Sequence, residues 1–193
     1  MLQEDRQIMA KVSFPPQLEF HFPCPIVLVT CGNWTKKNII AIGAVSHACI
    51  DPPMLGVAIG HSRYSYGVML SSDGFVVNVP SKSHVRIVDY CGSTSGKEVD
   101  KFTACKLTAA RSSKVAAPQI LEFPINIECA LRRRVELGSH DYFFGEIVAV
   151  HVDESVIDKD GKIDKRKLDP MTSLTDSYWS VGEAVGKFGS FSL

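Results

Sequence analysis

The most regular pattern along the chain is an alternation of apolar and polar residues in INIECALRRRVEL, residues 125–137. Apolar side chains take every second position except at Arg133, and a period of two is typical of a strand with one buried face. The turn-like stretch GSHD (138–141) follows, and then YFFGEIVAVHV (142–152), which is rich in aromatic and β-branched residues. The pattern predicts an antiparallel hairpin of two long strands.

Further short β-prone runs lie upstream, separated by Gly-Asn, Pro-Pro and Asp-Gly pairs. They are IVLVTC (26–31), IIAIGAVS (39–46), MLGVAIG (54–60) and FVVNVP (75–80). Strands this close together, with few long helical stretches between them, favour a β-barrel or sandwich over a doubly wound sheet. We therefore expect a mainly β fold with a few helices.

Three segments carry helical signals. SKSHVRIVDYCG (81–92) opens on a serine that suits an N-cap and closes on a glycine, GKEVDKFTACK (96–106) is shorter and charged, and SYGVMLSS (65–72) has room for about one turn of helix. No repeat or linker divides the chain, so residues 1–193 are expected to form one domain. Roughly residues 1–20 and the aromatic C-terminal tail (178–191) would be extensions, and the tail needs either its own barrel or a neighbour's to pack on.

Composition narrows the function classes. Hydrophobic residues make up 45% of the 193 positions, and the 21 Lys and Arg balance the 21 Asp and Glu. This balance argues against nucleic acid as a partner. Nothing approaches the stretch of about 18 apolar residues that spans a membrane, and the charged N-terminus is unlike a signal peptide. We expect a cytoplasmic protein.

Six cysteines are present, at positions 24, 31, 49, 91, 105 and 129, and none forms a CxxC pair. Most have apolar neighbours, so we interpret them as buried thiols, with structural zinc as the weaker alternative.

The stretch HSRYSYG (61–67) places four hydroxyl groups and one guanidinium between two apolar runs. A plain surface loop is one interpretation, because turns are often polar. The other is an anion seat, in which Arg63 supplies a fork of donors, Ser62 and Ser65 supply hydroxyls, and Gly60 permits close backbone approach. Nearby, AVSHACIDPP (44–53) combines small residues with two prolines, which suits backbone contacts to the edge of a planar heterocycle.

Several motifs follow one another along the chain. They are the stretch from NIIAIGAVSHACIDPP (38–53) to FVVNVP (75–80), and then SGKEVDKF (95–102), EFPINIECAL (122–131), GSHDYFFGEI (138–147) and YWSVGEAVGKFGSF (178–191). Together, in this order, they resemble the FMN-binding flavin reductase-like family. This family includes flavoredoxins and ferric or flavin reductases, and the likeness covers roughly residues 20–191. The resemblance implies an FMN-binding split β-barrel that forms a homodimer, with FMN near the subunit interface.

The resemblance also implies roles for individual residues. The phosphate clamp of the family falls on Arg63, Tyr64 and Ser65, and its ring-edge segment falls on Ser46, His47, Ala48 and Cys49. Further flavin contacts fall on Asn78 and Lys101. A catalytic position beside the flavin and the nicotinamide falls on His140. Two positions depart from the family pattern. Many relatives carry Thr or Ser at the position of Ala41, and Trp or Ser at the position of Ala44.

The function implied is that of an FMN-dependent oxidoreductase, an NAD(P)H:flavin or ferric reductase that transfers hydride to bound FMN. The alternative is a flavoredoxin-like electron carrier that a redox protein partner reduces, without its own NAD(P)H oxidation. A β-barrel that binds pyridoxal phosphate is a poorer third alternative, because no lysine is clearly placed for a Schiff base.

Other motifs are weaker. DKDGKIDKRK (158–167) resembles a calcium loop but lacks two key ligands, so we interpret it as a polar turn. His47 with Cys49, and Glu136 with His140, each fall short of a zinc ligand set. No GxSxG or GxGxxG motif occurs to support hydrolysis or a Rossmann site. The arginines of RRR (132–134) would lie on a solvated face or at a dimer interface.

Overall fold

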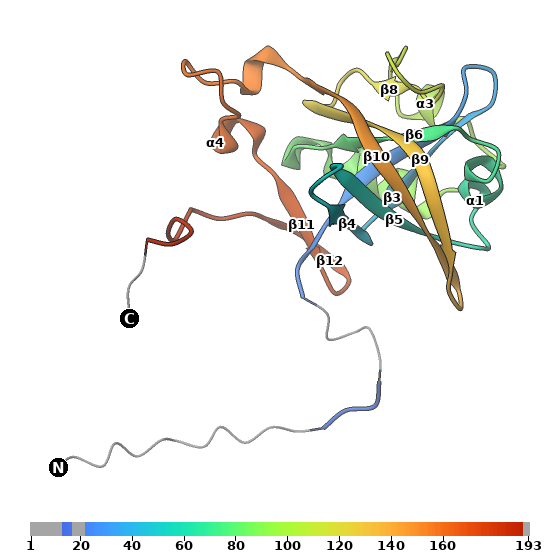
Figure 1. The fold of residues 1–193 in the computed structure, drawn as a ribbon, viewed down its shortest axis with the longest axis horizontal. Helices are drawn as coiled ribbons and strands as arrows, with labels where there is room; N and C mark the ends of the chain where they lie inside the picture. The colour runs from blue at the N-terminus through green and yellow to red at the C-terminus, as the bar shows by residue number, and fades with distance from the viewer. Residues whose placement is uncertain (1–12, 17–21, 191–193) are drawn as a thin grey trace.

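The computed structural model describes residues 13–16 and 22–190. The expected N-terminal extension therefore lies almost wholly outside the described residues. In the part described, a seven-stranded antiparallel sheet curls into a barrel with the strand order β3-β2-β6-β9-β10-β5-β4 (Figure 1). These strands are β2 (Val27–Gly32), β3 (Lys37–Ile42), β4 (Val45–Cys49), β5 (Met54–Gly60), β6 (Gly74–Val79), β9 (Ile125–Glu136) and β10 (His140–Val152).

Shorter elements surround the barrel. Strands β1 (Cys24–Pro25), β11 (Met171–Leu174) and β12 (Ser177–Ser180) form a second small sheet, and β7 (Ala109–Ala110) pairs with β8 (Gln119–Ile120). The helices are α1 (Tyr64–Met69), α2 (Val85–Ser93), α3 (Lys101–Ala104) and α4 (Lys165–Leu168), with 3₁₀ turns η1 (Lys82–His84) and η2 (Glu154–Val156). No helix in the described ranges is both long enough and apolar enough to cross a membrane.

The predicted long hairpin is confirmed as β9 and β10, which pair antiparallel with Asp141 opposite Glu136 and Val152 opposite Ile125. The turn is shorter than GSHD predicts, because His140 and Asp141 already belong to β10. This difference matters for function, since both side chains are then held by strand geometry and not by a loop.

The predicted run 39–46 is wrong as a single strand. The chain leaves β3 after Ile42, and Val45 begins β4 at the opposite edge of the sheet. The amide of Val45 donates to the carbonyl of Gly43, so a tight turn stands where the apolar pattern runs on unbroken. Strands β3 and β4 are thus the two edges at which the barrel remains open.

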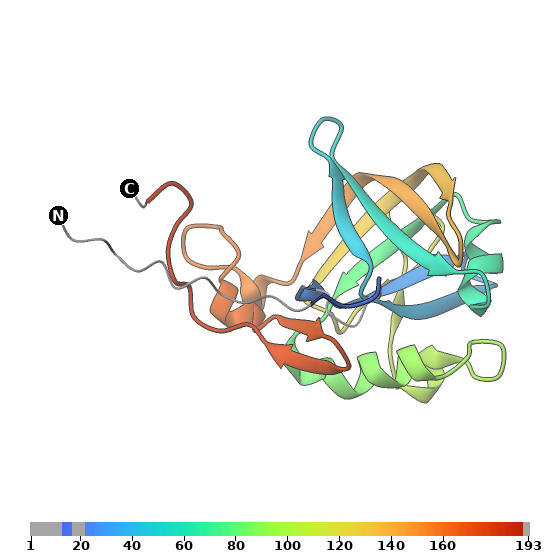
Figure 2. The same cartoon turned by 90° about the horizontal axis from the view of Figure 1, so that it is seen from below.

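The two larger apolar cores lie on the two faces of the curled sheet, and a small third cluster of Val76, Val115 and Ala117 lies beneath the loop 111–118. The core of the barrel interior includes Val29, Val57, Phe75, Val77 and Phe143, and each of these five side chains is at most 2% exposed. The second core fills the space between the sheet and the layer of α2 and α3, which runs along one side of the barrel (Figure 2). Each face of β2 is therefore buried, which explains why its sequence VLVTCG is apolar apart from Thr30, whose buried hydroxyl donates to the carbonyl of Pro118.

Helix boundaries differ from the sequence prediction. Ser81 caps η1, with its hydroxyl and amide both bonded to His84, and α2 continues past Gly92 to Ser93. Within 96–106 only Lys101–Ala104 is helical, because Asp100 caps a single turn by accepting from the amide of Phe102. The predicted helical turn after residue 64 is confirmed as α1.

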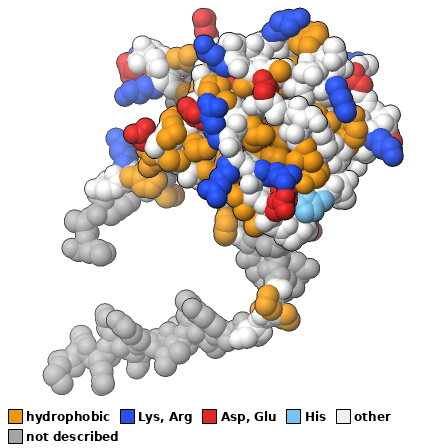
Figure 3. All heavy atoms as spheres, turned by 45° about the vertical axis from the view of Figure 1, so that its right-hand side comes forward, with side chains coloured by type: hydrophobic (Ala, Val, Ile, Leu, Met, Phe, Trp, Pro, Cys, Tyr) orange, Lys and Arg blue, Asp and Glu red, His pale blue; other side chains and the backbone are white. Residues whose placement is uncertain are grey.

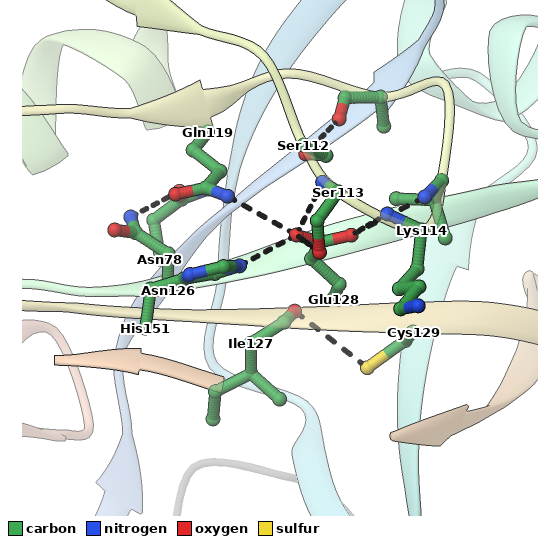
Figure 4. Close-up of polar contacts among 12 residues, drawn as sticks. Asn78, Ser112, Ser113, Lys114, Gln119, Asn126, Ile127, Glu128, Cys129 and His151 are labelled. Carbon is green, nitrogen blue, oxygen red and sulfur yellow. Dashed lines mark hydrogen bonds and ion pairs between the residues drawn. The ribbon is translucent and has the colours of Figure 1, made fainter. Parts of the chain in front are cut away.

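Glu128 on β9 organises the loop 111–118, as Figure 4 shows. Its fully buried carboxylate accepts the amides of Ser113, Lys114 and Val115, and His151 approaches it at 2.6 Å. Burial alone would raise the pKa of Glu128, but the hydrogen bonds from Ser113, His151 and Lys114 lower this pKa to about 2. The loop is therefore built around a buried carboxylate whose charged form the hydrogen bonds favour.

The cysteines follow the prediction in part. Cys31, Cys91 and Cys129 are buried free thiols, and burial raises the pKa of each to about 12. Cys49 is exposed instead, on the uncovered edge strand β4. No cluster of three or more metal-ligating side chains occurs in the described ranges.

Candidate functional site

A polar cavity of about 150 Å³ opens beside the loop between β5 and α1. It is lined by Asn38, Ile40, Ser62, Arg63, Tyr64, Ser65, Cys91, Gly92, Ser93, Thr94, Ser95, Gly96 and Lys101. These residues include two cations and six hydroxyl groups but no Asp or Glu. We call this set of residues the anion cavity, because positive charge and donors without a neutralising acid favour an anionic ligand.

The side chain of Arg63 is exposed, and among the described residues its guanidinium has no hydrogen bond or ion pair. Its backbone is fixed, since the amide of Arg63 donates to the carbonyl of Gly60 and its carbonyl accepts from Tyr66. The six-residue helix α1 then begins at Tyr64. An unpaired guanidinium on a fixed backbone is suited to capturing a phosphate.

Lys101 provides the second positive charge and is almost fully buried. Its ammonium donates to the carbonyl of Cys91 at 2.6 Å and to that of Ile39 at 2.8 Å. A lysine has three donors, so one N–H remains for a ligand. Burial is the largest cause of the lowered pKa of Lys101, and the nearby charge of Arg63 acts in the same direction. An anion between the two cations would offset this repulsion.

Asn38 is a residue of the cavity that the sequence argument missed. Its amide donates to Ser65 Oγ at 2.7 Å, and its side chain packs directly on Gly96. It therefore joins β3, α1 and the loop 94–97. The available signal was a polar residue at the start of an apolar strand, followed later by a glycine that allows close packing.

A second cavity of about 290 Å³ adjoins the first and shares Asn38, Tyr64, Gly96 and Lys101 with it. Its remaining wall includes Lys36, Lys37 and Lys97 but also Glu98 and Asp100. Because positive and negative side chains are mixed there, the anion cavity is the more selective place for a phosphate.

The predicted ring-edge residues Ser46, His47, Ala48 and Cys49 lie together on β4 and are exposed. Ser46 Oγ is 2.8 Å from Tyr142 Oη, which links β4 to β10 across β5. Among the described strands, the edge strand β4 pairs with β5 alone, so its outer edge leaves backbone groups free for a ligand.

His140 pairs with Gly60 in the β5–β10 ladder, three residues before Arg63. A Cβ at Gly60 would lie 3.3 Å from His140 Nε2, so this glycine makes room for the ring. Ser139 Oγ is 2.8 Å from His140 Nδ1 and holds its orientation. His140 shares one face of the sheet with Tyr142 and Ser46, and it stands at the strand end from which the Arg63 loop departs.

Asn78 is not brought to the cavity. It is fully buried on β6, where its amide donates to the Leu28 carbonyl and its oxygen accepts from Ile120 and Asn126. All of its hydrogen-bonding capacity goes to the protein, so we leave Asn78 out of the site as a structural residue. Ser65 is also buried, and it supports the site through Asn38.

Comparison with protein-family models matches residues 20–172 to the flavin reductase-like domain. The chain belongs to the flavin reductase-like family. Flavoredoxin of Desulfovibrio vulgaris (Miyazaki F) superposes with a TM-score of 0.86 and 34% identity, over 94% of this chain and 98% of that chain. The barrel is accordingly the split-barrel fold, as predicted.

Two relatives by sequence extend the comparison. An uncharacterised protein of Archaeoglobus fulgidus is 37% identical over 147 residues, 76% of this chain and 81% of that protein. An NADH-dependent FAD reductase of Streptomyces globisporus is 23% identical over 128 residues, 66% of this chain and 73% of that protein. For a member of the flavin reductase-like family, the anion cavity fits the phosphate of a flavin mononucleotide in charge and donor type.

Proposed function

We propose that this flavin reductase-like protein is an FMN-dependent oxidoreductase that oxidises NAD(P)H and passes the electrons to free flavin or ferric iron. The observation that carries the proposal is the anion cavity, where Arg63 and Lys101 stand together with no acid. Arg63 and the surrounding hydroxyls would hold the flavin phosphate, and the third N–H of Lys101 would donate to it.

The remaining residues would orient the ring and the nicotinamide. Backbone groups of Ser46–Cys49 on the open edge of β4 would hydrogen-bond the pyrimidine edge of the flavin. His140, held by Ser139 beside Gly60, would orient the nicotinamide and move a proton at Nε2. A bound flavin supplies the two-electron chemistry.

The first test measures FMN binding to the wild-type chain and to Arg63→Ala, with flavin fluorescence as the signal. Loss of one charge-assisted contact of about 2 kcal/mol weakens FMN binding about 30-fold. Arg132→Ala on β9 is the matched control, since its guanidinium is exposed and paired with Glu146. Unchanged FMN affinity in Arg63→Ala would place the cofactor elsewhere and remove the proposal.

The second candidate is an FMN-binding electron carrier reduced by a protein partner, and the likeness to a flavoredoxin favours keeping it. Anaerobic rapid mixing of the FMN-loaded chain with NADH and with NADPH separates the two functions. Bleaching of flavin absorbance by either nucleotide, slowed in His140→Ala, supports the reductase. Reduction only by a reduced redox protein supports the carrier.

A further inference from the structure

Both ends of the segment 61–66, which carries Arg63, are bonded to a single carboxylate. Asp141 Oδ1 lies 2.6 Å from His61 Nε2, and Asp141 Oδ2 accepts from Tyr66 Oη at 2.8 Å. The Asp141 side chain is only 1% exposed, and Arg134 Nε is 3.5 Å from Oδ2. The hydrogen-bond and ion-pair partners of this carboxylate in the described ranges are His61, Tyr66 and Arg134, and none of them lines the anion cavity, so Asp141 acts on the segment from outside the cavity.

The position of Asp141 on β10 explains this geometry. It pairs with Ile59 of β5, so its side chain points into the end of the barrel, on the opposite face from His140. There the ring of Tyr66 packs edge-on against Phe143, with centroids 6.0 Å apart, and His61 contacts Tyr66 at 5.0 Å. The loop is tied to the hairpin a second time, because the amide of His61 donates to the carbonyl of Ser139.

We propose that Asp141 is a positioning residue for phosphate recognition, which fixes the segment 61–66 so that the guanidinium of Arg63 faces the anion cavity. The inference rests on the proposed function, since it assumes that the anion cavity receives the flavin phosphate. Arg63 is exposed, and its side chain has no hydrogen bond or ion pair to residues 13–16 or 22–190, so it does not itself hold the segment. A segment bonded only through its backbone would spend part of its time with Arg63 turned to solvent. The population of such conformers lowers the apparent affinity of the cavity for the flavin phosphate.

Selectivity for a phosphorylated flavin follows from this arrangement. Riboflavin shares the ring and ribityl chain of FMN but lacks the phosphate. A residue that acts only by positioning Arg63 changes FMN affinity and leaves riboflavin affinity as it was. A residue that merely supports the fold changes both affinities together.

The experiment titrates the full-length chain with FMN and with riboflavin, using flavin fluorescence, for wild type and Asp141→Asn. Asparagine keeps the size of the side chain but removes the negative charge and leaves one acceptor oxygen, so His61 Nε2 and Tyr66 Oη no longer share a carboxylate. FMN affinity is expected to fall about tenfold while riboflavin affinity stays within about twofold. The control is Asp160→Asn, an exposed aspartate whose carboxylate has no hydrogen bond among the described residues, and it leaves both affinities unchanged.

Tyr66→Phe provides the second variant, because it removes one hydrogen bond to Asp141 and keeps the ring packed on Phe143. It is expected to weaken FMN binding about threefold without affecting riboflavin. Circular dichroism checks folding, and the Tyr66→Phe result decides the question if Asp141→Asn does not fold.

Equal losses for both flavins, or no loss of FMN affinity, would overturn the positioning role of Asp141. Failure of the proposed function is distinguishable, since Arg63→Ala would then bind FMN as well as wild type does. A loss in Arg63→Ala without a loss in Asp141→Asn or Tyr66→Phe refutes only the inference about Asp141.

Discussion

Three charged side chains are buried within the described part of the chain, and each is stabilised in a different way. Lys101 donates to two carbonyls and retains one donor. Glu128 accepts from the loop 111–118, and Asp141 bonds both ends of the segment 61–66. A buried charge is costly unless it is paired or hydrogen-bonded. The free donor of Lys101 therefore points to a ligand, whereas the saturated Glu128 points to stability.

Replacement of Glu128 by Gln is expected to lower the free energy of unfolding by about 3 kcal/mol at pH 7. The amide would oppose the amides of the 113–115 loop with a donor of its own. Urea denaturation measures the loss. Glu146→Gln, whose partner Arg132 lies on the surface, is the matched control and should cost less than about 1 kcal/mol.

The sign of the pH dependence follows from the pKa of Glu128, which lies at about 2 in the folded chain against 4.5 for the free group. Its contribution is complete above pH 4.5 and is lost as the pH falls toward 2. The difference between wild type and Glu128→Gln should therefore shrink in acid. A difference that stays constant from pH 7 to pH 3 would contradict the role assigned to this carboxylate.

At the scale of elements, the anion cavity depends on how closely the loop after α2 approaches β3. Gly96 permits this approach, because a Cβ at that position would clash with the amide group of Asn38. Asn38 in turn holds Ser65 at the start of α1. One backbone contact thus sets the spacing between three elements around the cavity.

Gly96→Ala is expected to displace Asn38, to lower stability by about 1–3 kcal/mol and to weaken FMN binding. Thermal unfolding and flavin titration measure the two effects. Gly138→Ala in the β9–β10 turn is the control, since a Cβ there meets nothing within 4 Å. Wild-type FMN affinity in Gly96→Ala would show that the spacing does not matter for the ligand.

At the scale of the whole molecule, apolar side chains remain uncovered. The hairpin β11–β12 contacts α2 through Tyr178 Oη and Asp89, but the chain beyond it leaves the barrel, as Figure 1 shows. We call residues 181–190 the C-terminal arm. On this arm the side chain of Val185 is 97% exposed, and that of Phe188 is fully exposed. Figure 3 also shows hydrophobic side chains gathered between charged ones on one face of the barrel. We propose a second copy of the chain as the partner that covers such surfaces.

Light scattering should accordingly find a homodimer at micromolar concentration. The double variant Val185→Asp with Phe188→Asp is expected to weaken the dimer about tenfold or more, because apolar anchors dominate interfaces. Lys187→Asp, a change of charge at an exposed position on the same arm, is the comparison. A wild-type monomer under these conditions would remove the dimer from the proposal.

The sequence by itself determined the elements whose signals are local. The period of two in 125–137 predicts β9, since alternation depends only on which face of one strand is buried. The hydroxyls around Arg63 suggested an anion seat, but the residues alone left a plain surface loop as the alternative. The family likeness supplied the split barrel, which no single run of residues could specify.

Only the tertiary structure decided which polar side chains have partners already. Asn78 resembles a ligand residue in sequence, yet its partners lie up to 50 residues away and use its whole amide. In the part of the chain that the structure describes, the Arg63 guanidinium has no polar partner, whereas Asp141 is bonded to residues 75 and 80 positions earlier. Hydrogen bonds between segments so far apart in the sequence form only when the barrel closes. The local pattern of residues therefore cannot predict them.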